Sequence, residues 1–150
     1  MSKKYYITTP IYYPSAKPHM GHAYTSIIAD FFARFKRMDG FDVHFLTGTD
    51  EHGLKIQRAA EKKGLEPLKF CDDISQTFRN LSETLNLSNT DFIRTTEERH
   101  KKTVQYLWAE LEKNDDIYLS EYSGWYSISD EAFYNDDEIE EKDEKKIASA

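Results

Sequence analysis

The sequence contains a single cysteine, Cys71, in 150 residues, and this scarcity excludes several kinds of protein. One cysteine cannot form an internal disulfide, so a disulfide-stabilised secreted domain is excluded and a reducing compartment is favoured. It also excludes a zinc site built from several thiolates. Because Cys71 follows Phe70 in a predicted helix, we expect it to be a small core residue and not a catalytic thiol.

Long apolar runs and an excess of basic residues are missing as well. No apolar stretch approaches the roughly 18 residues that a membrane-spanning helix needs, and no apolar segment of signal-peptide length follows the first four residues. The 20 basic and 27 acidic residues give a net charge of −7, which is not the basic footprint of a nucleic-acid-binding domain. We therefore expect a cytoplasmic protein without membrane contact. Whether its compartment is bacterial cytoplasm or an organelle stays open at this point.

The apolar residues that are present follow alternating strand and helix patterns. They make up 39% of the chain, which is enough for one domain with a real core. The charged residues 136–146 are predicted to form a solvated helix or a fraying tail. The other patterns predict strands at 5–9 and 43–47, candidate strands at 91–94 and 117–120, helices at about 19–39, 54–63, 67–86 and 96–114, and a hairpin at 122–134.

The first strand, the long helix and the second strand form a βαβ unit. This unit requires parallel pairing of its strands and a right-handed crossover. In an open parallel sheet, ligands bind beyond the carboxyl ends of the strands, where loops lead into helices. Two loops occupy such positions, Thr9–His22 and Thr47–Gly53. We therefore expect the two loops to face the same crevice.

The first loop ends in a pattern that suits phosphate. His19 and His22 stand three residues apart where a helix begins, and a helix N-terminus offers free N–H groups and a partial positive charge. Their imidazoles could donate hydrogen bonds to phosphate oxygens, and Gly21 leaves room for a flat ring such as adenine. The spacing is neither that of a P-loop nor that of a dinucleotide-binding loop. Any phosphate here would be bound by imidazoles.

A strand, a Pro-containing loop and His19-Met20-Gly21-His22 at a helix start resemble the signature of the class I aminoacyl-tRNA synthetases. Residues 8–14 and 45–53 are similar to those of the methionyl-tRNA synthetase family in particular, and the resemblance runs from about 5 to 134. It implies an α/β fold with a Rossmann-like doubly wound parallel sheet. Residues 1–116 would be the first half of the catalytic domain, and 117–150 the start of a small β-rich connective insertion.

The resemblance also implies a role for individual residues. A thioether suits apolar and aromatic walls, and a carboxylate suits an α-ammonium group. A plainer alternative for Asp50 is that it only caps the next helix. The implied roles are catalysis by His19 and His22; ATP binding by His19, Gly21 and His22 within the region Tyr12–His22; methionine binding by Ile11, Tyr13 and Asp50; and support from Pro10, Glu51 and His52.

The implied reaction is that of a methionine–tRNA ligase. The carboxylate of L-methionine attacks the α-phosphorus of ATP to give methionyl-adenylate, and the methionyl group then passes to tRNA(Met). Positioning and charge stabilisation carry out this catalysis without a protein nucleophile. Mg²⁺ would accompany ATP, bound mainly by the phosphates. The tRNA would be bound mainly by parts of the family's fold that this sequence does not include.

The chain departs from the family in two ways. The second nucleotide-binding half, with its Lys-Met-Ser-Lys-Ser loop, and the anticodon domain are not in these 150 residues, and residues 145–149 match that loop poorly. We therefore expect the chain alone not to charge tRNA. In addition, Ser127 and Asp130 stand where many relatives have a Cys-x-x-Cys zinc pair, so we predict no zinc. We expect a small aromatic core there instead, formed by Trp125, Tyr126, Phe133 and Tyr134.

Three other interpretations are open at this point. The first is a metal-dependent hydrolase with His19, His22, Asp50 and His52 as ligands. The second is a fragment that binds ligands without catalysis. The third keeps the synthetase class but changes the amino acid to a branched aliphatic one or to cysteine.

Overall fold

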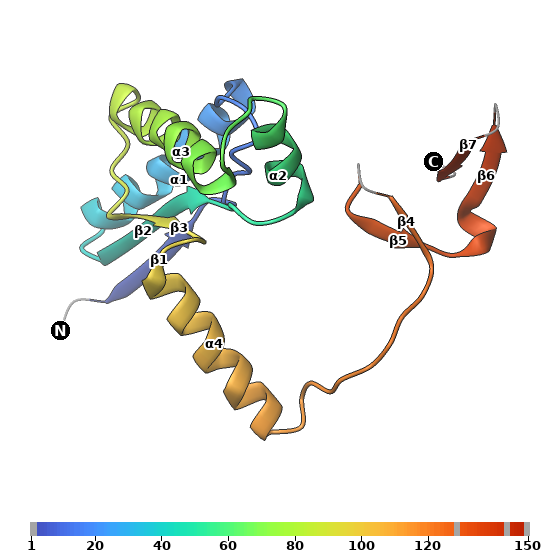
Figure 1. The fold of residues 1–150 in the computed structure, drawn as a ribbon. Coiled ribbons are helices and arrows are strands. Elements are labelled where there is room, and N and C mark those ends of the chain that lie inside the picture. The colour runs from blue at the N-terminus through green and yellow to red at the C-terminus, as the bar shows by residue number, and fades with distance from the viewer. Residues whose placement is uncertain (1–2, 128–129, 143–144, 149–150) are drawn as a thin grey trace. The chain divides into compact units, whose positions relative to one another are not determined.

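The structure, a computed structural model, describes residues 3–127, 130–142 and 145–148 (Figure 1). Predictions that involve Ile128, Ser129, Asp143, Glu144 or Ser149 therefore lie outside the described residues at those positions. The chain divides into two compact units, Met1–Tyr106 and Leu107–Ala150, and each is described by itself. None of the described helices has the length and apolarity needed to cross a membrane.

The first unit is built on three parallel strands in the order β1-β2-β3. Its register runs from Lys4↔Asp42 to Thr8↔Leu46 and from Leu46↔Asp91 to Thr49↔Arg94. The predicted parallel α/β, Rossmann-like sheet is thus confirmed, and the candidate strand at 91–94 is real. The elements are β1 (Lys4–Thr8), α1 (Met20–Met38), β2 (Asp42–Thr49), α2 (Leu54–Glu61), α3 (Pro67–Thr84), β3 (Asp91–Arg94) and the start of α4 (Glu98–Lys113).

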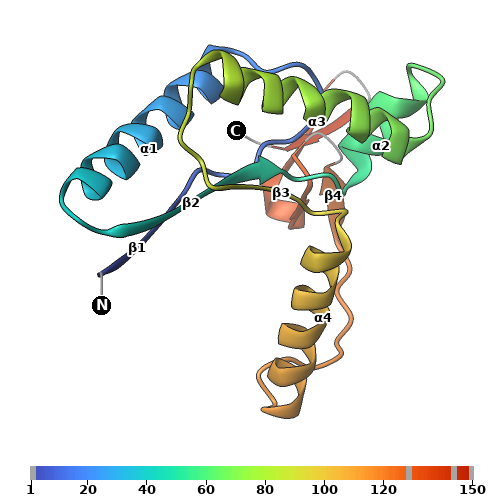
Figure 2. The ribbon, with the colours of Figure 1, turned by 90° about the vertical axis from the view of Figure 1, so that its left-hand side faces the viewer.

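The helices α1 and α3 lie on the same side of this sheet (Figures 1 and 2). Both connections run from strand to strand in the same direction, so right-handed crossovers put both helices on one face. Alternate residues of β2 are accordingly buried: Val43, Phe45, Thr47 and Thr49 face the helices. A core cluster under α3 and α2 includes Tyr12, Ile56, Ala60, Phe70, Cys71, Ile74, Phe78 and Phe92.

Helix α1 packs through its small residues. Its buried positions are Ala23, Ser26, Ala29, Asp30 and Ala33, whereas its large apolar side chains are 40–83% exposed between Met20 and Phe35. Small side chains let the helix axis approach the sheet closely, and Ala29 and Ala33 contact the cluster of Val43 and Phe45. The helix exists where the sequence predicted it, but its apolar stripe faces outward. That stripe consists of Tyr24, Ile27, Ile28, Phe31, Phe32 and Phe35.

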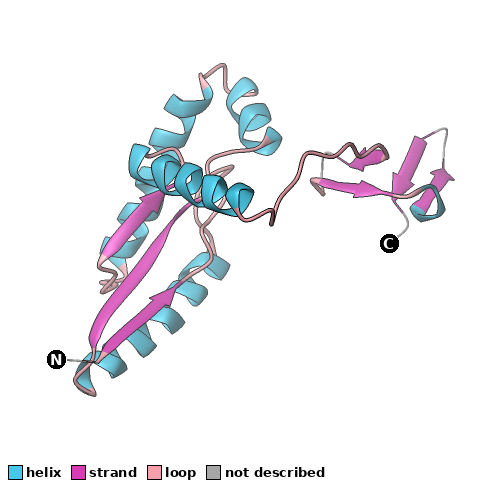
Figure 3. Cartoon of the chain, turned by 90° about the horizontal axis from the view of Figure 1, so that it is seen from below, coloured by secondary structure: helices cyan, strands magenta, loops and turns pink. Residues whose placement is uncertain are grey.

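The second unit contains the end of α4 and two small antiparallel sheets (Figure 3). Strands β4 (Trp125–Ser127) and β5 (Ala132–Tyr134) form the predicted hairpin. A 3-10 turn (Asp136–Glu138) precedes β6 (Ile139–Lys142), which pairs with β7 (Lys145–Ala148). The helix or fraying tail predicted for 136–146 was therefore wrong, because the charged residues pair as strands.

Two other predictions for this unit need correction. Residues 117–120 were a candidate strand, but they form no strand in the structure. The predicted aromatic core is only an open cluster: the Tyr126 and Phe133 rings meet edge-on at 5.0 Å, yet they are 45% and 53% exposed. A hairpin of two three-residue strands has too little surface to bury such rings. The domain boundary predicted after residue 116 falls in the loop that follows α4.

Candidate active site

The two loops predicted to share a crevice are joined through the backbone of Tyr12. Its N–H donates to the carbonyl of Gly48 at 2.9 Å, and its own carbonyl accepts from the N–H of Asp50 at 2.9 Å. Tyr12 thereby forms a parallel bridge with Thr49. The loop after β1 thus runs beside the carboxyl end of β2, and the residues of both loops face one region.

His19 and His22 cap the helix α1 reciprocally. The Nδ1 atom of His19 accepts from the N–H of Gly21 at 3.1 Å, and the Nδ1 atom of His22 accepts from the N–H of His19 at 3.1 Å. These bonds satisfy N–H groups that a helix start otherwise leaves free. The geometry is that of a capping box, with imidazoles in place of the usual hydroxyl and carboxylate.

This arrangement determines the tautomer of both imidazoles. A nitrogen that accepts a hydrogen bond carries no proton, so in each ring the proton is assigned to Nε2. Burial and, secondarily, the neighbouring His19 lower the pKa of His22, which favours its neutral form. The ring centroids of His19 and His22 lie 3.9 Å apart. The site therefore presents two neighbouring Nε2–H donors, which suit an oxyanion.

Gly21 makes the position of His19 possible. A Cβ atom at residue 21 would lie 2.9 Å from Cε1 and 3.1 Å from Nδ1 of His19, closer than such atoms can pack. In this structure, then, the imidazole of His19 occupies the space beside Gly21. The contact of Gly21 with adenine stays a prediction.

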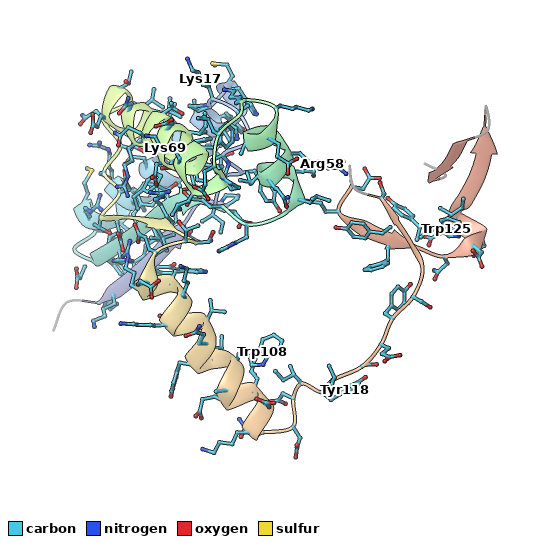
Figure 4. All side chains as sticks on the ribbon, in the orientation of Figure 1. Lys17, Arg58, Lys69, Trp108, Tyr118 and Trp125 are labelled. Carbon is cyan, nitrogen blue, oxygen red and sulfur yellow. The ribbon has the colours of Figure 1, made fainter. Side chains whose placement is uncertain are left out.

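A cavity of about 330 Å³ opens beside the histidines. It brings the two predicted methionine residues, Ile11 and Tyr13, to the same wall as His19 and His22. The loop also contributes Lys17, whose position is marked in Figure 4. Lys17 lies within the predicted region Tyr12–His22, but the sequence analysis gave it no role of its own. The signal that could have found it was a cation between Pro14 and Pro18 in the loop that was predicted to bind phosphate. The remaining lining residues are Tyr12, Ser15 and Ala16.

Tyr12 packs against His22, a role that the sequence analysis did not assign although it placed Tyr12 at the start of the predicted ATP-binding region. Its side chain is 8% exposed, and its hydroxyl lies 2.9 Å from Oγ of Ser26 in α1. Its ring stacks on Phe78 of α3 at 5.5 Å and meets the ring of His22 edge-on at 4.8 Å. The sequence signal was the alternation of Ile11, Tyr12 and Tyr13 beyond β1, which buries the middle residue when the chain stays extended.

Asp50 leaves its carboxylate available to a ligand. Its N–H is bound to Tyr12, but the carboxylate has no hydrogen bond or ion pair within the part of the chain that the structure describes. Gly53 is the N-cap of α2, and no side chain caps it. The alternative in which Asp50 only caps the next helix is therefore wrong.

Glu51 and His52, predicted as supporting residues, are engaged differently. Glu51 is 4% exposed, and its carboxylate accepts from Arg94 Nε at 2.7 Å, which leaves it no freedom for chemistry. His52 is exposed, and its Nε2 lies 3.2 Å from the carbonyl of Thr95. Pro10 is exposed as well, and its carbonyl accepts from the hydroxyl of Thr9 at 2.8 Å.

Metal binding receives no support from these positions. Within residues 3–127, 130–142 and 145–148, no three His, Cys, Asp or Glu side chains are grouped to hold a metal ion. The Nδ1 atoms of both histidines are already bound to backbone N–H groups. In the second unit, Ser127 donates to Asp130 at 2.6 Å, and this hydroxyl and carboxylate do not fit a structural zinc ion, which takes thiolate or imidazole ligands.

Cys71 is the core residue that the sequence predicted. It is 1% exposed, and burial, with a contribution from the charge of Glu51, raises the pKa of its thiol to about 11. The thiol is therefore protonated at neutral pH and is not a nucleophile.

Comparison with known proteins agrees with this geometry. The family described as tRNA synthetases class I (M) matches residues 5–145. A methionine–tRNA ligase of Rickettsia bellii is 55% identical over 139 residues, which cover 93% of this chain and 27% of that protein. A mitochondrial methionine–tRNA ligase of Takifugu rubripes is 53% identical over 138 residues, covering 92% and 23%.

A solved structure is similar over almost the whole chain. It is the Mycobacterium tuberculosis methionyl-tRNA synthetase in complex with methionyl-adenylate, with a TM-score of 0.91 and 46% identity over 97% of this chain and 29% of that one. The chain thus spans less than a third of the length of these relatives. The family match covers most of the sequence and includes both loops of the site. The chain belongs to the class I tRNA synthetases of the methionine type.

Proposed function

We propose that this chain forms the ATP- and methionine-binding part of a methionine–tRNA ligase. The observation that carries the proposal is that two Nε2–H donors, on His19 and His22, and the carboxylate of Asp50 lie on loops joined through Tyr12. Among the described residues, that carboxylate has no hydrogen bond or ion pair. ATP and an amino acid together require a site that binds an anion, the phosphates, beside a site that binds a cation, the α-ammonium group.

The anion site would bind the ATP phosphates. The N-terminus of α1 carries a partial positive charge, and the two imidazole donors lie directly at it. Charge that builds up on the phosphates in the transition state would be stabilised by these fixed donors. Lys17, which lines the same cavity, adds an exposed cation. Mg²⁺ would come with ATP and be bound mainly by the phosphates.

The cation site would bind methionine. Asp50 would accept hydrogen bonds from the α-ammonium group, and Ile11 and Tyr13 would contact the thioether side chain. The relative from Mycobacterium tuberculosis is described in complex with methionyl-adenylate, and its 46% identity supports the same ligand here. The methionine carboxylate would then attack the α-phosphorus, and pyrophosphate would leave.

The proposal extends to the partners and location of the protein. Transfer of the methionyl group would be to tRNA(Met), as the names of the relatives imply. The bacterial relatives support a cytoplasmic location, and the mitochondrial relative makes an organelle the alternative. We propose that the second unit holds no zinc, and a metal analysis that finds one zinc per chain would contradict this.

Methionine-dependent exchange of pyrophosphate into ATP tests the function, in the protein at the full length that its gene encodes. We expect Asp50→Asn to raise the KM for methionine by about tenfold or more, because the ammonium group loses a charged partner, with little change in the KM for ATP. Asp42→Asn, at the other end of β2, is the matched control and should leave both values unchanged. Exchange that depends on a branched aliphatic amino acid or on cysteine instead of methionine would overturn the proposed substrate.

A further inference from the structure

The loop that carries Asp50 is held by a buried ionic contact at the residue next to it. The side chain of Glu51 has no exposed surface, and its carboxylate accepts hydrogen bonds from Thr49 Oγ1 at 2.7 Å, Arg94 Nε at 2.7 Å and Thr96 Oγ1 at 2.5 Å. A buried carboxylate is stable only when its charge is matched and its lone pairs are bound. Glu51 is thus a fixed point of the loop.

Arg94 supplies the positive charge at this point. It is the last residue of β3, and its side chain is only 18% exposed. While Nε donates to Glu51, Nη2 lies 2.7 Å from Oδ1 of Asp72 in α3, an ion pair that lacks the geometry of a hydrogen bond. One guanidinium therefore ties the loop after β2 to both β3 and α3. A lysine, with a single terminal nitrogen, lacks the planar fork that this geometry uses.

The backbone around Asp50 is held from two sides as a result. The N–H of Glu51 donates to Oγ1 of Thr95 at 2.8 Å, next to Arg94 in the chain. On the other side, the N–H of Asp50 donates to the carbonyl of Tyr12. Asp50 is thus fixed by its main chain, while its own carboxylate makes no hydrogen bond or ion pair with the residues that the structure describes.

We propose that Arg94 is a positioning residue for the amino-acid substrate, because by pairing with Glu51 it holds Asp50 where its carboxylate meets the substrate ammonium group. This inference deepens the proposed function and rests on it. Arg94 does not touch the substrate. Without Arg94, Glu51 would be a buried charge with no cation, so it would take up a proton or turn toward solvent. Either change leaves the loop without the ionic contact between Glu51 and Arg94, so the neighbouring Asp50 would lose its fixed position.

The test compares Arg94→Met, Arg94→Lys and the double variant Arg94→Met with Glu51→Gln. Arg99→Met is the matched control, because Arg99 also bridges two carboxylates, Asp91 and Glu97, each at 2.6 Å, but does not contact the loop. The first readout is the amide hydrogen exchange of Asp50 and Glu51 in the 150-residue chain. The second is the KM for methionine and for ATP in methionine-dependent pyrophosphate exchange by the full-length protein.

We expect Arg94→Met to speed amide exchange at both loop residues and to raise the KM for methionine roughly 10- to 100-fold, while the KM for ATP stays within about twofold. Arg94→Lys should lie between this variant and the unaltered protein. The double variant should recover part of the lost affinity, because it removes the unmatched charge. Arg99→Met should change neither readout.

Other outcomes would overturn the inference. If Arg94→Met raises both KM values by the same factor, or loosens the loop without affecting methionine, Arg94 is merely structural. If the double variant has the same KM for methionine as Arg94→Met, the unmatched charge of Glu51 is not what connects Arg94 to methionine binding. Absence of methionine-dependent pyrophosphate exchange in the unaltered protein would instead overturn the proposed function and with it the substrate role of Arg94. Amide exchange would then still report whether Arg94 holds the loop.

Discussion

At the scale of single residues, the proposed phosphate site depends on imidazoles that cap a helix through Nδ1. His22 accepts a hydrogen bond at Nδ1 from the N–H of His19, and protonation of Nδ1 would abolish that bond. The lowered pKa of His22, caused first by burial and then by His19, means that the folded chain takes up a proton less readily than the unfolded chain. Folding and an intact cap therefore favour the same protonation state.

This linkage predicts how stability changes with pH. Because the folded-state pKa of His22 is below its unfolded value of about 6.5, its contribution is fully present above that pH and is lost as the pH falls below it. We expect the free energy of unfolding to fall more between about pH 7 and about pH 5 in the unaltered chain than in His22→Asn, which keeps an acceptor but does not titrate. Chemical denaturation at each pH measures this. Parallel curves for both proteins would contradict it.

At the scale of secondary-structure elements, the site depends on the close approach of β2 and β3. Gly48 pairs with Ile93, and a Cβ atom at residue 48 would overlap the carbonyl oxygen of Ile93. The carbonyl of Gly48 also accepts from the N–H of Tyr12. One position thus determines the strand spacing and the junction of the two loops.

Gly48→Ala should therefore lower the stability of the fold more than the same substitution at a glycine whose only special feature is a positive φ. We expect it to lower the free energy of unfolding by roughly 2–3 kcal/mol or more, because backbone must move. Gly40→Ala is the control: φ there is +82° and no atom lies within 4 Å, so only strain of about 1–2 kcal/mol applies. Denaturant unfolding of both variants measures the two losses in the free energy of unfolding. Equal losses would show that β2 and β3 can separate without cost.

The elements also show where sequence reasoning succeeded and where it could not. The periods of apolar residues located all three parallel strands and the helices, because these patterns reflect local geometry. These patterns could not tell which face of α1 packs on the sheet. The large side chains Phe31 and Phe35 offer more apolar surface to bury, but the small Ala29 and Ala33 allow a closer approach to β2 and are the buried ones. The pairing of Glu51 with Arg94 depends on a contact between residues 43 positions apart, which spacing does not reveal. The cap of His19 is local, but it was missed because imidazoles are not among the usual capping side chains.

At the scale of the whole molecule, the outward apolar stripe of α1 determines how the chain behaves on its own. Phe31 and Phe35 are 63% and 53% exposed, and they belong to a contiguous stripe on one helix. Exposed apolar surface of this kind drives association in water. It also lies in the unit that carries the candidate site.

We therefore expect the 150-residue chain to self-associate at micromolar concentration. The double variant Phe31→Ser with Phe35→Ser should shift it toward the monomer, as measured by sedimentation velocity. Tyr118→Ser is the control, because Tyr118 is 86% exposed but lies in a loop outside the stripe. If the control and the double variant sediment alike, the stripe is not the contact surface.

The junction at Tyr12 has a consequence for the energetics of two ligands. The main chain of Tyr12 is hydrogen-bonded to Gly48 and Asp50, while its ring contacts His22. A ligand that orders either loop restricts this shared residue, so the conformational entropy lost on binding the first ligand need not be lost again for the second. The two proposed ligands, ATP and methionine, should consequently bind with positive cooperativity, and by thermodynamic linkage each should raise the affinity for the other by the same factor.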